Sequence, residues 1–318
     1  MNSISNYNDP LATPLDLERL RTFVVAAETL NYTQAARRLR LSQPAISQQI
    51  HELEEDLGLA LFARRGRGLA LTPAGEALVP HAQHLLGEAR RVSDALDAFR
   101  GVPQGSMLLG AEPTPGVYLL PRILGELTQR HPALKSSLHV MEGESLWPRL
   151  RTGALDLAVV ETPPAPGQLS GWHAERCFED ELVVIAPPSH PWAERGTIHP
   201  DELAGEALIL RQPDAALRRG YAQQLAAAGF APDRLSARFE LSSSEGIKHA
   251  VMAGLGAGIV PLLSLEVELE AGRLKVVRLD GLKLSLPYYL LRPEKRPLNV
   301  FQQMLVDRLL SSPEGPAC

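Results

Sequence analysis

Apolar residues recur at helical spacing three times within the first sixty positions of the chain. A spacing of three or four residues places such positions on one face of a helix. The pattern predicts a first helix on Leu17, Leu20, Phe23, Val24 and Ala27, a short second helix over 33–39, and a third helix on Ile46, Ile50, Leu53 and Leu57. Asn31 or Thr33 can cap the second helix and Ser42 the third, Pro44 is tolerated in a first turn, and Gly58 ends the third helix.

Two short apolar runs and one long amphipathic stretch follow these helices. The segment LALFARRGRGLALT is typical of a small hairpin with a basic tip, so residues 15–72 are predicted to form a winged helix-turn-helix. Residues 73–101 read as one long helix, whose apolar stripe is Leu78, Leu85, Val92, Leu96 and Phe99. A connecting helix that is covered by the next domain would explain the stripe. A coiled-coil-like dimerisation helix would explain both the stripe and the length of the helix. Gly and Pro around 102–104 predict a hinge.

Beyond residue 105 short apolar runs alternate with helical patterns. The strand candidates are SMLLGAE, SSLHVME, LDLAVVE, ELVVIAP, EALILR, GIVPL and LPYYLL. This alternation predicts an α/β domain with mainly parallel strands over 105–311. The chain crosses twice between two lobes, near 162–181 and 278–289, which gives lobe I about 105–174 and 278–311 and lobe II about 175–277. Two lobes with two crossovers make a hinged cleft, where small ligands usually bind.

Composition narrows the class of protein. Hydrophobic residues make up 45% of the 318 positions and charged residues 22%, and no apolar run of about 20 residues could span a bilayer. Residues 1–14 have neither the basic nor the apolar region of a signal peptide, so we expect a disordered lead-in, a short tail at 312–318, and no membrane association. Cys177 and Cys318 are the only cysteines, which argues against a disulfide framework and fits a cytoplasmic protein.

The distribution of charge says more than its sum. The net charge of −5 gives no hint of nucleic acid binding. Residues 31–72, however, contain six arginines and four acidic residues, and the acidic residues lie between two arginine clusters. This local excess of positive charge coincides with the predicted helix-turn-helix and its wing.

The exposed face of the third helix suits base edges. With its apolar residues facing the core, Gln43, Ser47, Gln48 and His51 lie toward the opposite side. Glutamine can bond adenine bidentately, and the helix N-terminus directs free amides toward phosphate. On this helix alone, a capped amphipathic helix with a bland polar face is an equal alternative. The preceding helix, the turn and the basic wing favour DNA reading.

The segment LRTFVVAAETLNYTQAARRLRLSQPAISQQIHELEEDLGLALFARRGRGLALTPAGEAL resembles the DNA-binding end of LysR-type transcriptional regulators, and the resemblance extends over nearly the whole chain. It implies base contacts from Gln43, Pro44, Ser47 and Gln48, backbone contacts from Thr33, Arg37 and Ser42, and wing contacts from Arg64, Arg65 and Arg67. It further implies a sequence-specific regulator that binds an interrupted dyad in double-stranded promoter DNA as a homodimer or homotetramer. RNA polymerase is an expected partner if the protein is an activator.

The C-terminal part resembles the family's effector domain, a two-lobed α/β fold similar to periplasmic binding proteins. The resemblance implies a small-molecule effector of unknown identity, no other cofactor and no metal. It places effector contacts at Pro113, Thr114, Pro115, Gly116, Ser145, Arg218, Ser243 and Ser244. Thr114 can equally be a helix N-cap, since a cap and a ligand contact use the same atoms. Asp214 and Ala215 depart from the family's Gly-Ser-rich turn, which puts anion binding by lobe II in doubt, and Lys248 is expected in a surface salt bridge.

Within the LysR-type family, the sequence motifs of the chain most resemble those of regulators of carbon fixation and of sulfite or cysteine metabolism. Cys177 is expected to be a packing residue rather than a redox switch. An enzyme is the first alternative, but the chain has no phosphate loop, nucleophile elbow or metal-ligand spacing, and a solvated helix face explains His81 and His84 better than a metal site. A winged head on an unrelated sensor domain and a scaffolding protein are further alternatives. The effector, the target genes and the sign of regulation do not follow from the residues.

Overall fold

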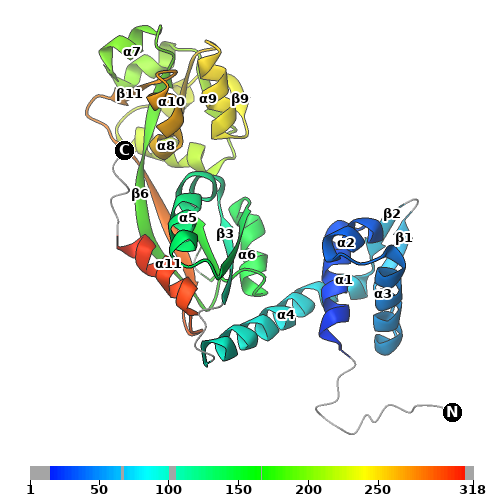
Figure 1. Ribbon diagram of the computed structural model, residues 1–318. Coiled ribbons are helices and arrows are strands. Elements are labelled where there is room, and N and C mark those ends of the chain that lie inside the picture. The colour runs from blue at the N-terminus through cyan, green and yellow to red at the C-terminus, as the bar shows by residue number, and fades with distance from the viewer. Residues whose placement is uncertain (1–14, 66–67, 100–104, 166, 312–318) are drawn as a thin grey trace, which may run out of the picture. The chain divides into compact units, whose positions relative to one another are not determined.

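The computed structural model describes residues 15–65, 68–99, 105–165 and 167–311. The chain forms two compact units (Figure 1). One consists of the chain up to residue 102 together with residues 148–154, and the other of residues 103–147 and 155 onward. The predicted lead-in at 1–14, the hinge at 102–104, the tail at 312–318 and the wing residue Arg67 lie outside the described residues.

The first unit is a winged helix-turn-helix followed by a long helix. Its elements are α1 (Leu17–Thr29), α2 (Tyr32–Leu39), α3 (Gln43–Leu57), β1 (Phe62–Arg65), β2 (Gly68–Leu71) and α4 (Pro73–Phe99). Strands β1 and β2 pair antiparallel, so the predicted hairpin is confirmed. The core buries apolar side chains from α1, α2, α3 and the chain before β1, among them Leu20, Phe23, Ala35, Ile46, Ile50, Leu53 and Leu61.

The helix boundaries follow from local capping. The side chain of Asn31 accepts hydrogen bonds from the amides of Thr33 and Gln34, so of the two candidates Asn31 caps α2. Ser42 caps α3, and Gly58 ends that helix with a φ of 65°, a left-handed conformation that glycine adopts without strain. The predicted starts and ends of α2 and α3 are therefore confirmed.

Two details of the predicted core are wrong. Leu17 is 48% exposed and Ala27 is only partly buried, whereas Thr22 and Ala26 are buried on α1. The buried face of α1 is rotated relative to the face that the apolar spacing predicts, because it includes the hydroxyl-bearing Thr22. Its Oγ1 is satisfied by a 2.5 Å hydrogen bond to Oε1 of Gln49 on α3, which removes most of the cost of burying it.

The long helix α4 changes character along its length. Its first half packs into the core of the winged head through Leu78, Val79, Ala82 and Leu86, a contact that neither sequence-based explanation of the stripe included. Three other apolar side chains of α4, those of Leu85, Val92 and Leu96, are 40%, 58% and 57% exposed. Apolar side chains at this spacing and exposure are available to a partner helix.

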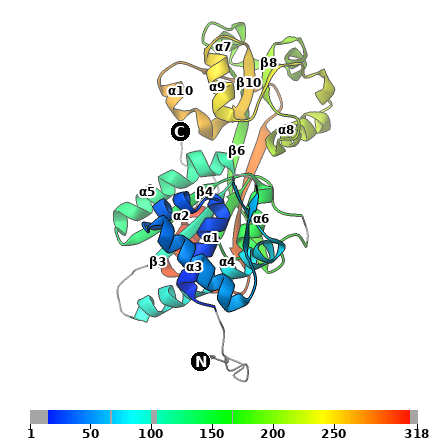
Figure 2. The ribbon, with the colours of Figure 1, turned by 90° about the vertical axis from the view of Figure 1, so that its right-hand side faces the viewer.

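The second unit is built on one sheet of ten strands. Its main order is β4 (Leu134–Val140), β3 (Gly105–Ala111), β5 (Leu157–Val160), β12 (Leu284–Pro293), β6 (Trp172–Ala186), β10 (Ala257–Pro261), β8 (Leu208–Arg211) and β9 (Ala237–Leu241), while β11 (Lys275–Leu279) pairs with β6 and with β7 (Thr197–Ile198). The long strands β6 and β12 pair over ten positions and run from one half of the sheet into the other (Figure 2). They correspond to the two predicted crossovers.

The strands are less uniformly parallel than predicted. Pairs β3–β4, β3–β5, β8–β9 and β8–β10 are parallel, whereas every pair that involves β6 or β12 is antiparallel. The two crossover strands themselves join the sheet, and each runs against the strands beside it. All seven predicted strands are present, but β7, β9 and β11 were missed because they are short or partly exposed.

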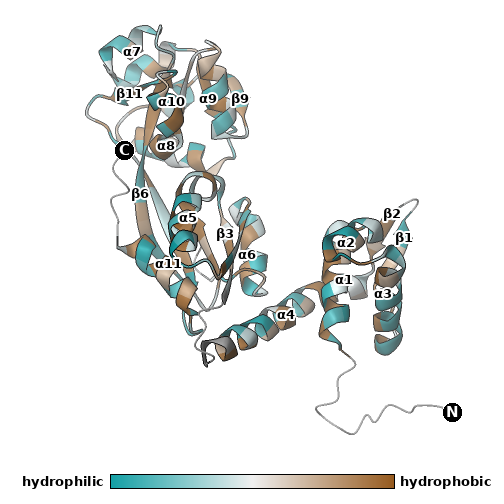
Figure 3. Ribbon diagram, in the orientation of Figure 1, coloured by the Kyte–Doolittle hydropathy of each residue, from teal (hydrophilic) through white to brown (hydrophobic). Residues whose placement is uncertain are grey.

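Helices cover both faces of each half of the sheet. The first half carries α5 (Leu120–Arg130), α6 (Gly143–Arg151) and α11 (Val300–Leu310), and the second carries α7 (Pro191–Arg195), α8 (Ala216–Ala227), α9 (Ser244–Met252) and α10 (Glu266–Glu270). A π-helical turn, η1 (Pro115–Leu119), precedes α5. Hydrophilic residues line the outer helix faces (Figure 3). None of the described helices combines the length and apolar character that crossing a membrane requires.

Candidate DNA interface and ligand site

The start of α3 presents the predicted base-reading face. The Ser42 hydroxyl oxygen accepts a hydrogen bond of 3.2 Å from the amide of Ala45, which fixes the first turn. Gln43, Ser47 and Gln48 are exposed on the side of α3 opposite its buried residues. Among the described residues, the side chains of Gln43 and Ser47 make no hydrogen bond, whereas the Gln48 amide group donates to Glu52 over 2.9 Å. Gln43 and Ser47 are therefore free to contact another molecule, and Gln48 would have to leave Glu52 to do so.

The preceding helix supports that face. Thr33 and Arg37 are exposed on α2. Arg40 ends α2 in the left-handed region, with a φ of 58°, and the amide of Leu41 bonds to the carbonyl of Ala36 over 2.9 Å. This turn redirects the chain into α3 and fixes the angle between the two helices of the motif.

The acidic residues of this segment are held by structural partners. Glu54 accepts hydrogen bonds from the amides of Leu61 and Phe62, at 2.7 and 3.1 Å, and so ties the end of α3 to β1. Glu52 and Asp56 pair with Arg19 of α1 at 3.1 and 2.5 Å. Arg64 and Arg65, by contrast, are exposed on β1. The exposed arginines of β1 thus place positive charge at the wing, away from these acidic residues.

Replacing Arg65 with alanine is expected to weaken binding to every DNA sequence alike. A phosphate contact releases counterions without reading bases, so its loss should reduce the slope of log K against log salt by about one per wing. The slope is measured by titrating a labelled duplex at several salt concentrations. Arg130→Ala, which removes the same charge from the second unit, is the control and should leave the slope unchanged.

Three buried strands of the second unit end in charged residues. Glu112 follows β3, Glu161 follows β5 and Arg211 ends β8. Glu112 is 6% exposed, and one of its carboxylate oxygens accepts hydrogen bonds from the amides of Glu161 and Thr162 at 2.5 and 3.4 Å. Burial, together with the charge of Glu161, raises the pKa of Glu112 to about 7. The carboxyl ends of strands are where ligands bind in folds of this kind.

Thr114 contacts a carboxylate of the chain itself. It is buried, and its Oγ1 donates to Oε1 of Glu161 over 2.5 Å, while its amide lies 3.4 Å from the same oxygen. Its side chain makes no capping hydrogen bond to the turn that follows, so the N-cap alternative is wrong. Glu161 thus occupies the place where the sequence predicts a ligand anion. Burial raises the pKa of Glu161, and the charge of Arg211 opposes that rise.

Arg218, the predicted effector contact, is held by the protein itself, whereas the neighbouring Arg211 has few partners. Nη1 of Arg218 donates to the carbonyl of Arg211 and to Glu240, both over 2.7 Å. Arg218 therefore holds the end of β8 in place and is not free to point inward. Arg211 is 8% exposed, and its guanidinium has one long ion pair, 4.0 Å from Nη2 to Glu142.

The crossover strands contribute a buried acid. The Tyr288 hydroxyl of β12 donates to Oδ2 of Asp180 on β6 over 3.0 Å, and the amide of Leu263 lies 3.2 Å from Oδ1. Burial raises the pKa of Asp180 to about 6. Nearby on β6, Cys177 is 1% exposed and its thiol donates to the carbonyl of Tyr288 over 3.5 Å, with burial raising its pKa to about 12. This thiol is packed and un-ionised, as a packing residue would be.

The other predicted effector residues take different places. Ser145 is exposed on α6, and Ser243 caps α9 by accepting from the amide of Gly246 over 3.1 Å, next to the buried Ser244. Pro113 is partly exposed and Pro115 buried. A Cβ on Gly116 would lie 2.7 Å from the Val140 side chain. Gly116 is therefore needed for close packing of η1 on the sheet.

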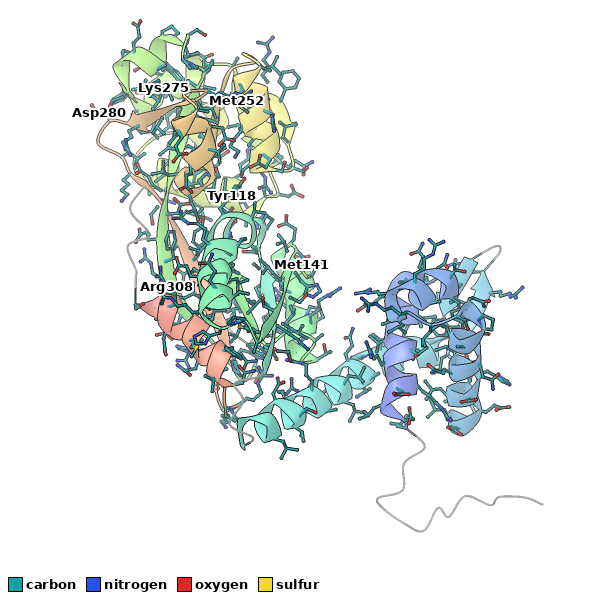
Figure 4. All side chains as sticks on the ribbon, viewed as in Figure 1. Tyr118, Met141, Met252, Lys275, Asp280 and Arg308 are labelled. Atoms are coloured by element: carbon teal, nitrogen blue, oxygen red, sulfur yellow. The ribbon has the colours of Figure 1, made fainter. Side chains whose placement is uncertain are left out.

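Lys248 is buried, so its expected place in a surface salt bridge is wrong. The side chain is 3% exposed, and Nζ lies 2.6 Å from Glu245, 3.0 Å from Glu268 and 2.7 Å from the carbonyl of Ser264. The Tyr118 hydroxyl of η1 also donates to Glu245, at a point where the two halves of the sheet domain face each other (Figure 4). Helix α9 thus carries an ion-pair network that joins both halves.

Sequence reasoning missed Glu112, Glu161, Asp180, Arg211 and Tyr288. A signal for three of them was present, since the runs LLGAE, LAVVE and LILR each end a hydrophobic strand in a charged residue. Asp180 and Tyr288 lie within long strands and gave no such signal. Among the described residues, no three His, Cys, Asp or Glu side chains gather as a metal site requires.

Comparison with known proteins matches both units. Residues 17–76 match the model of the bacterial regulatory helix-turn-helix protein, lysR family, and residues 100–312 match the LysR substrate binding domain. The chain is 32% identical over 276 residues to the RuBisCO operon transcriptional regulator of Allochromatium vinosum, which covers 87% of this chain and 89% of that protein. The predicted likeness to regulators of carbon fixation is confirmed.

Solved structures agree on the fold. Full-length CbnR complexed with its target DNA superposes with a TM-score of 0.68 at 22% identity, covering 94% of this chain and all of that one, a likeness that concerns the fold alone. The regulatory domain of CcmR from Synechocystis, in complex with 2-PG, superposes with a TM-score of 0.57 at 26% identity and covers 67% of this chain and all of that domain.

Proposed function

The chain belongs to the LysR family of transcriptional regulators, and from that premise we propose that it reads an interrupted dyad in promoter DNA through Gln43, Pro44, Ser47 and Gln48 of α3. Thr33, Arg37 and Ser42 would contact the DNA backbone, and Arg64, Arg65 and Arg67 phosphate or the minor groove. The observation that carries this assignment is the capped, exposed N-terminal face of α3, together with the exposed Arg64 and Arg65 of the wing. A recognition helix with these residue types is suited to the major groove.

The protein acts as a dimer or tetramer. One winged unit supplies few phosphate contacts, so several units are needed for useful affinity at physiological salt. The exposed stripe of Leu85, Val92 and Leu96 on α4 supports a partner helix there. Two-fold symmetry of the protein then matches a dyad in the DNA.

A small molecule at the strand ends of the second unit controls this binding. The residues that bring a ligand into contact with both halves are Glu142 and Glu161 on one side and Arg211 on the other. Linkage requires that the ligand favour one arrangement of the halves over another. We propose no catalysis, no metal and no further cofactor, a cytoplasmic location, and RNA polymerase as a partner if the protein activates.

Replacing Gln43 with alanine is expected to relax base preference at one position of each half-site. A bidentate contact discriminates by about 1–3 kcal/mol, so the affinity ratio between the preferred and a substituted base should fall about five- to hundredfold. Selection from random duplexes by the wild type and the variant measures this ratio. Gln223→Ala, the same change on an exposed side chain of α8, should keep the wild-type preference, and an unchanged preference for Gln43→Ala would contradict the assignment.

A further inference from the structure

Arg211 is a buried cation without adequate partners. It is 8% exposed, its Nε is buried without a hydrogen bond among the described residues, and its one ion pair spans 4.0 Å. A guanidinium has five N–H donors and stays charged at all relevant pH values. A buried charge of this kind is costly unless it is paired. Its planar fork fits a carboxylate or phosphate with two parallel hydrogen bonds.

The surroundings of Arg211 are acidic, which restricts the anion. Glu142 faces it across the sheet ends, with a side chain that is 68% exposed, and Glu161 lies close enough for the charge of Arg211 to act on its carboxylate. Thr114 holds Glu161 in place and has no hydroxyl proton left for a ligand. A ligand with only negative groups would meet these two carboxylates as well as the arginine. A ligand with an additional ammonium group would satisfy all three side chains.

We propose that the effector is a small zwitterion of the amino acid type, whose acidic group binds Arg211 and whose ammonium group binds Glu142 and Glu161. The inference rests on the proposed function and specifies the chemistry of its ligand. Arg211 supplies the two donors that recognise the acidic group, and the carboxylates supply acceptors for the ammonium protons. Overall neutrality of the ligand matches a site in which a further anion is disfavoured.

Calorimetric titration of the full-length protein tests this assignment. The probes are the common L-amino acids one by one and, for each that binds, the 2-hydroxy acid and the decarboxylated amine with the same side chain. Each analogue removes one charged contact and should bind about ten- to hundredfold more weakly than the amino acid. Inorganic phosphate and 2-PG, which lack an ammonium group, should bind more weakly still.

Single substitutions test which side chain binds the acidic group of the ligand and which binds its ammonium group. Arg211→Gln should abolish binding of the amino acid and lower the melting temperature of the unliganded protein little, because Nε has no hydrogen bond among the described residues and the one ion pair spans 4.0 Å. Glu142→Gln should weaken binding of the amino acid but not binding of its 2-hydroxy analogue. Glu144→Gln, the same change on an exposed neighbour, should change neither titration.

Two results would overturn the inference. One is that no amino acid binds, and the other is that a 2-hydroxy acid, phosphate or 2-PG binds as tightly as the amino acid or more tightly. DNA binding of the same preparations separates this failure from a failure of the proposed function. Retained sequence-specific DNA binding would support the proposed regulator function and reject only the proposal that the effector is a zwitterion.

Discussion

Replacing Lys248 with methionine is expected to lower the free energy of unfolding of the second unit by about 3–5 kcal/mol, the cost of leaving the largely buried Glu268 without its cation. Lys248 lies 2.6 Å from Glu245 and 3.0 Å from Glu268, and the side chain of Glu268 is 12% exposed. Methionine fills a similar volume, so the loss reports charge rather than a cavity. Urea unfolding followed by the fluorescence of the domain measures the change.

A second substitution distinguishes the charge effect from a packing effect. Adding Glu268→Leu to Lys248→Met removes the acid that is left without a partner and should restore a large part of the lost stability. Lys275→Met, at an exposed position on β11 (Figure 4), should leave stability within about 0.5 kcal/mol of the wild type. If Lys248→Met were as mild as Lys275→Met, the buried network would not stabilise the domain.

Replacing Glu112 with glutamine is expected to remove a pH-dependent loss of stability. The pKa of Glu112 is raised from 4.5 to about 7 in the folded protein, so the stability that its protonated form provides is fully present below pH 4.5 and is lost as pH rises through about 7. The shift corresponds to about 3 kcal/mol. Glutamine stays neutral and retains an oxygen that can accept the amides of Glu161 and Thr162.

The difference in unfolding free energy between wild type and Glu112→Gln reports the titration of Glu112 together with its coupling to Glu161 and Glu142, whose charges act on it. Relative to the wild type, the variant should gain stability steadily between pH 4.5 and 7 and show a constant difference above about pH 8. Glu144→Gln should show no such gain. A difference that did not vary with pH would mean that Glu112 is ionised in the folded protein throughout this range.

The helices of the first unit could be predicted from sequence because the signals that start and end them are local. A capping residue, a helical repeat and a terminating glycine lie within a few residues of one another, as Asn31, Ser42 and Gly58 illustrate. The buried Thr22 was missed because its hydrogen bond is made by Gln49, twenty-seven positions away. Local patterns do not report partners at that distance.

The buried charged groups of the second unit were harder to predict for the same reason. Lys248 is polar and sits on an amphipathic helix, and only the approach of Glu268 from another element makes it a buried ion pair. The turn at Thr114 is a local feature, but the partner of its hydroxyl, Glu161, follows a strand 47 positions on. The turn at Thr114 could be identified from the local sequence. Its contact with the Glu161 carboxylate could not, because that contact depends on which strand ends the sheet brings together.

The most direct test of the regulator assignment is selection of genomic fragments by the purified full-length protein at near-physiological salt, followed by sequencing of the retained DNA. A LysR-type regulator that reads bases through α3 should retain a few promoter fragments that share an interrupted inverted repeat. Specific sites are bound about 10³–10⁷-fold more tightly than other DNA, so enrichment should be plain. Retention of all fragments alike, or of none, would contradict sequence-specific reading by this helix.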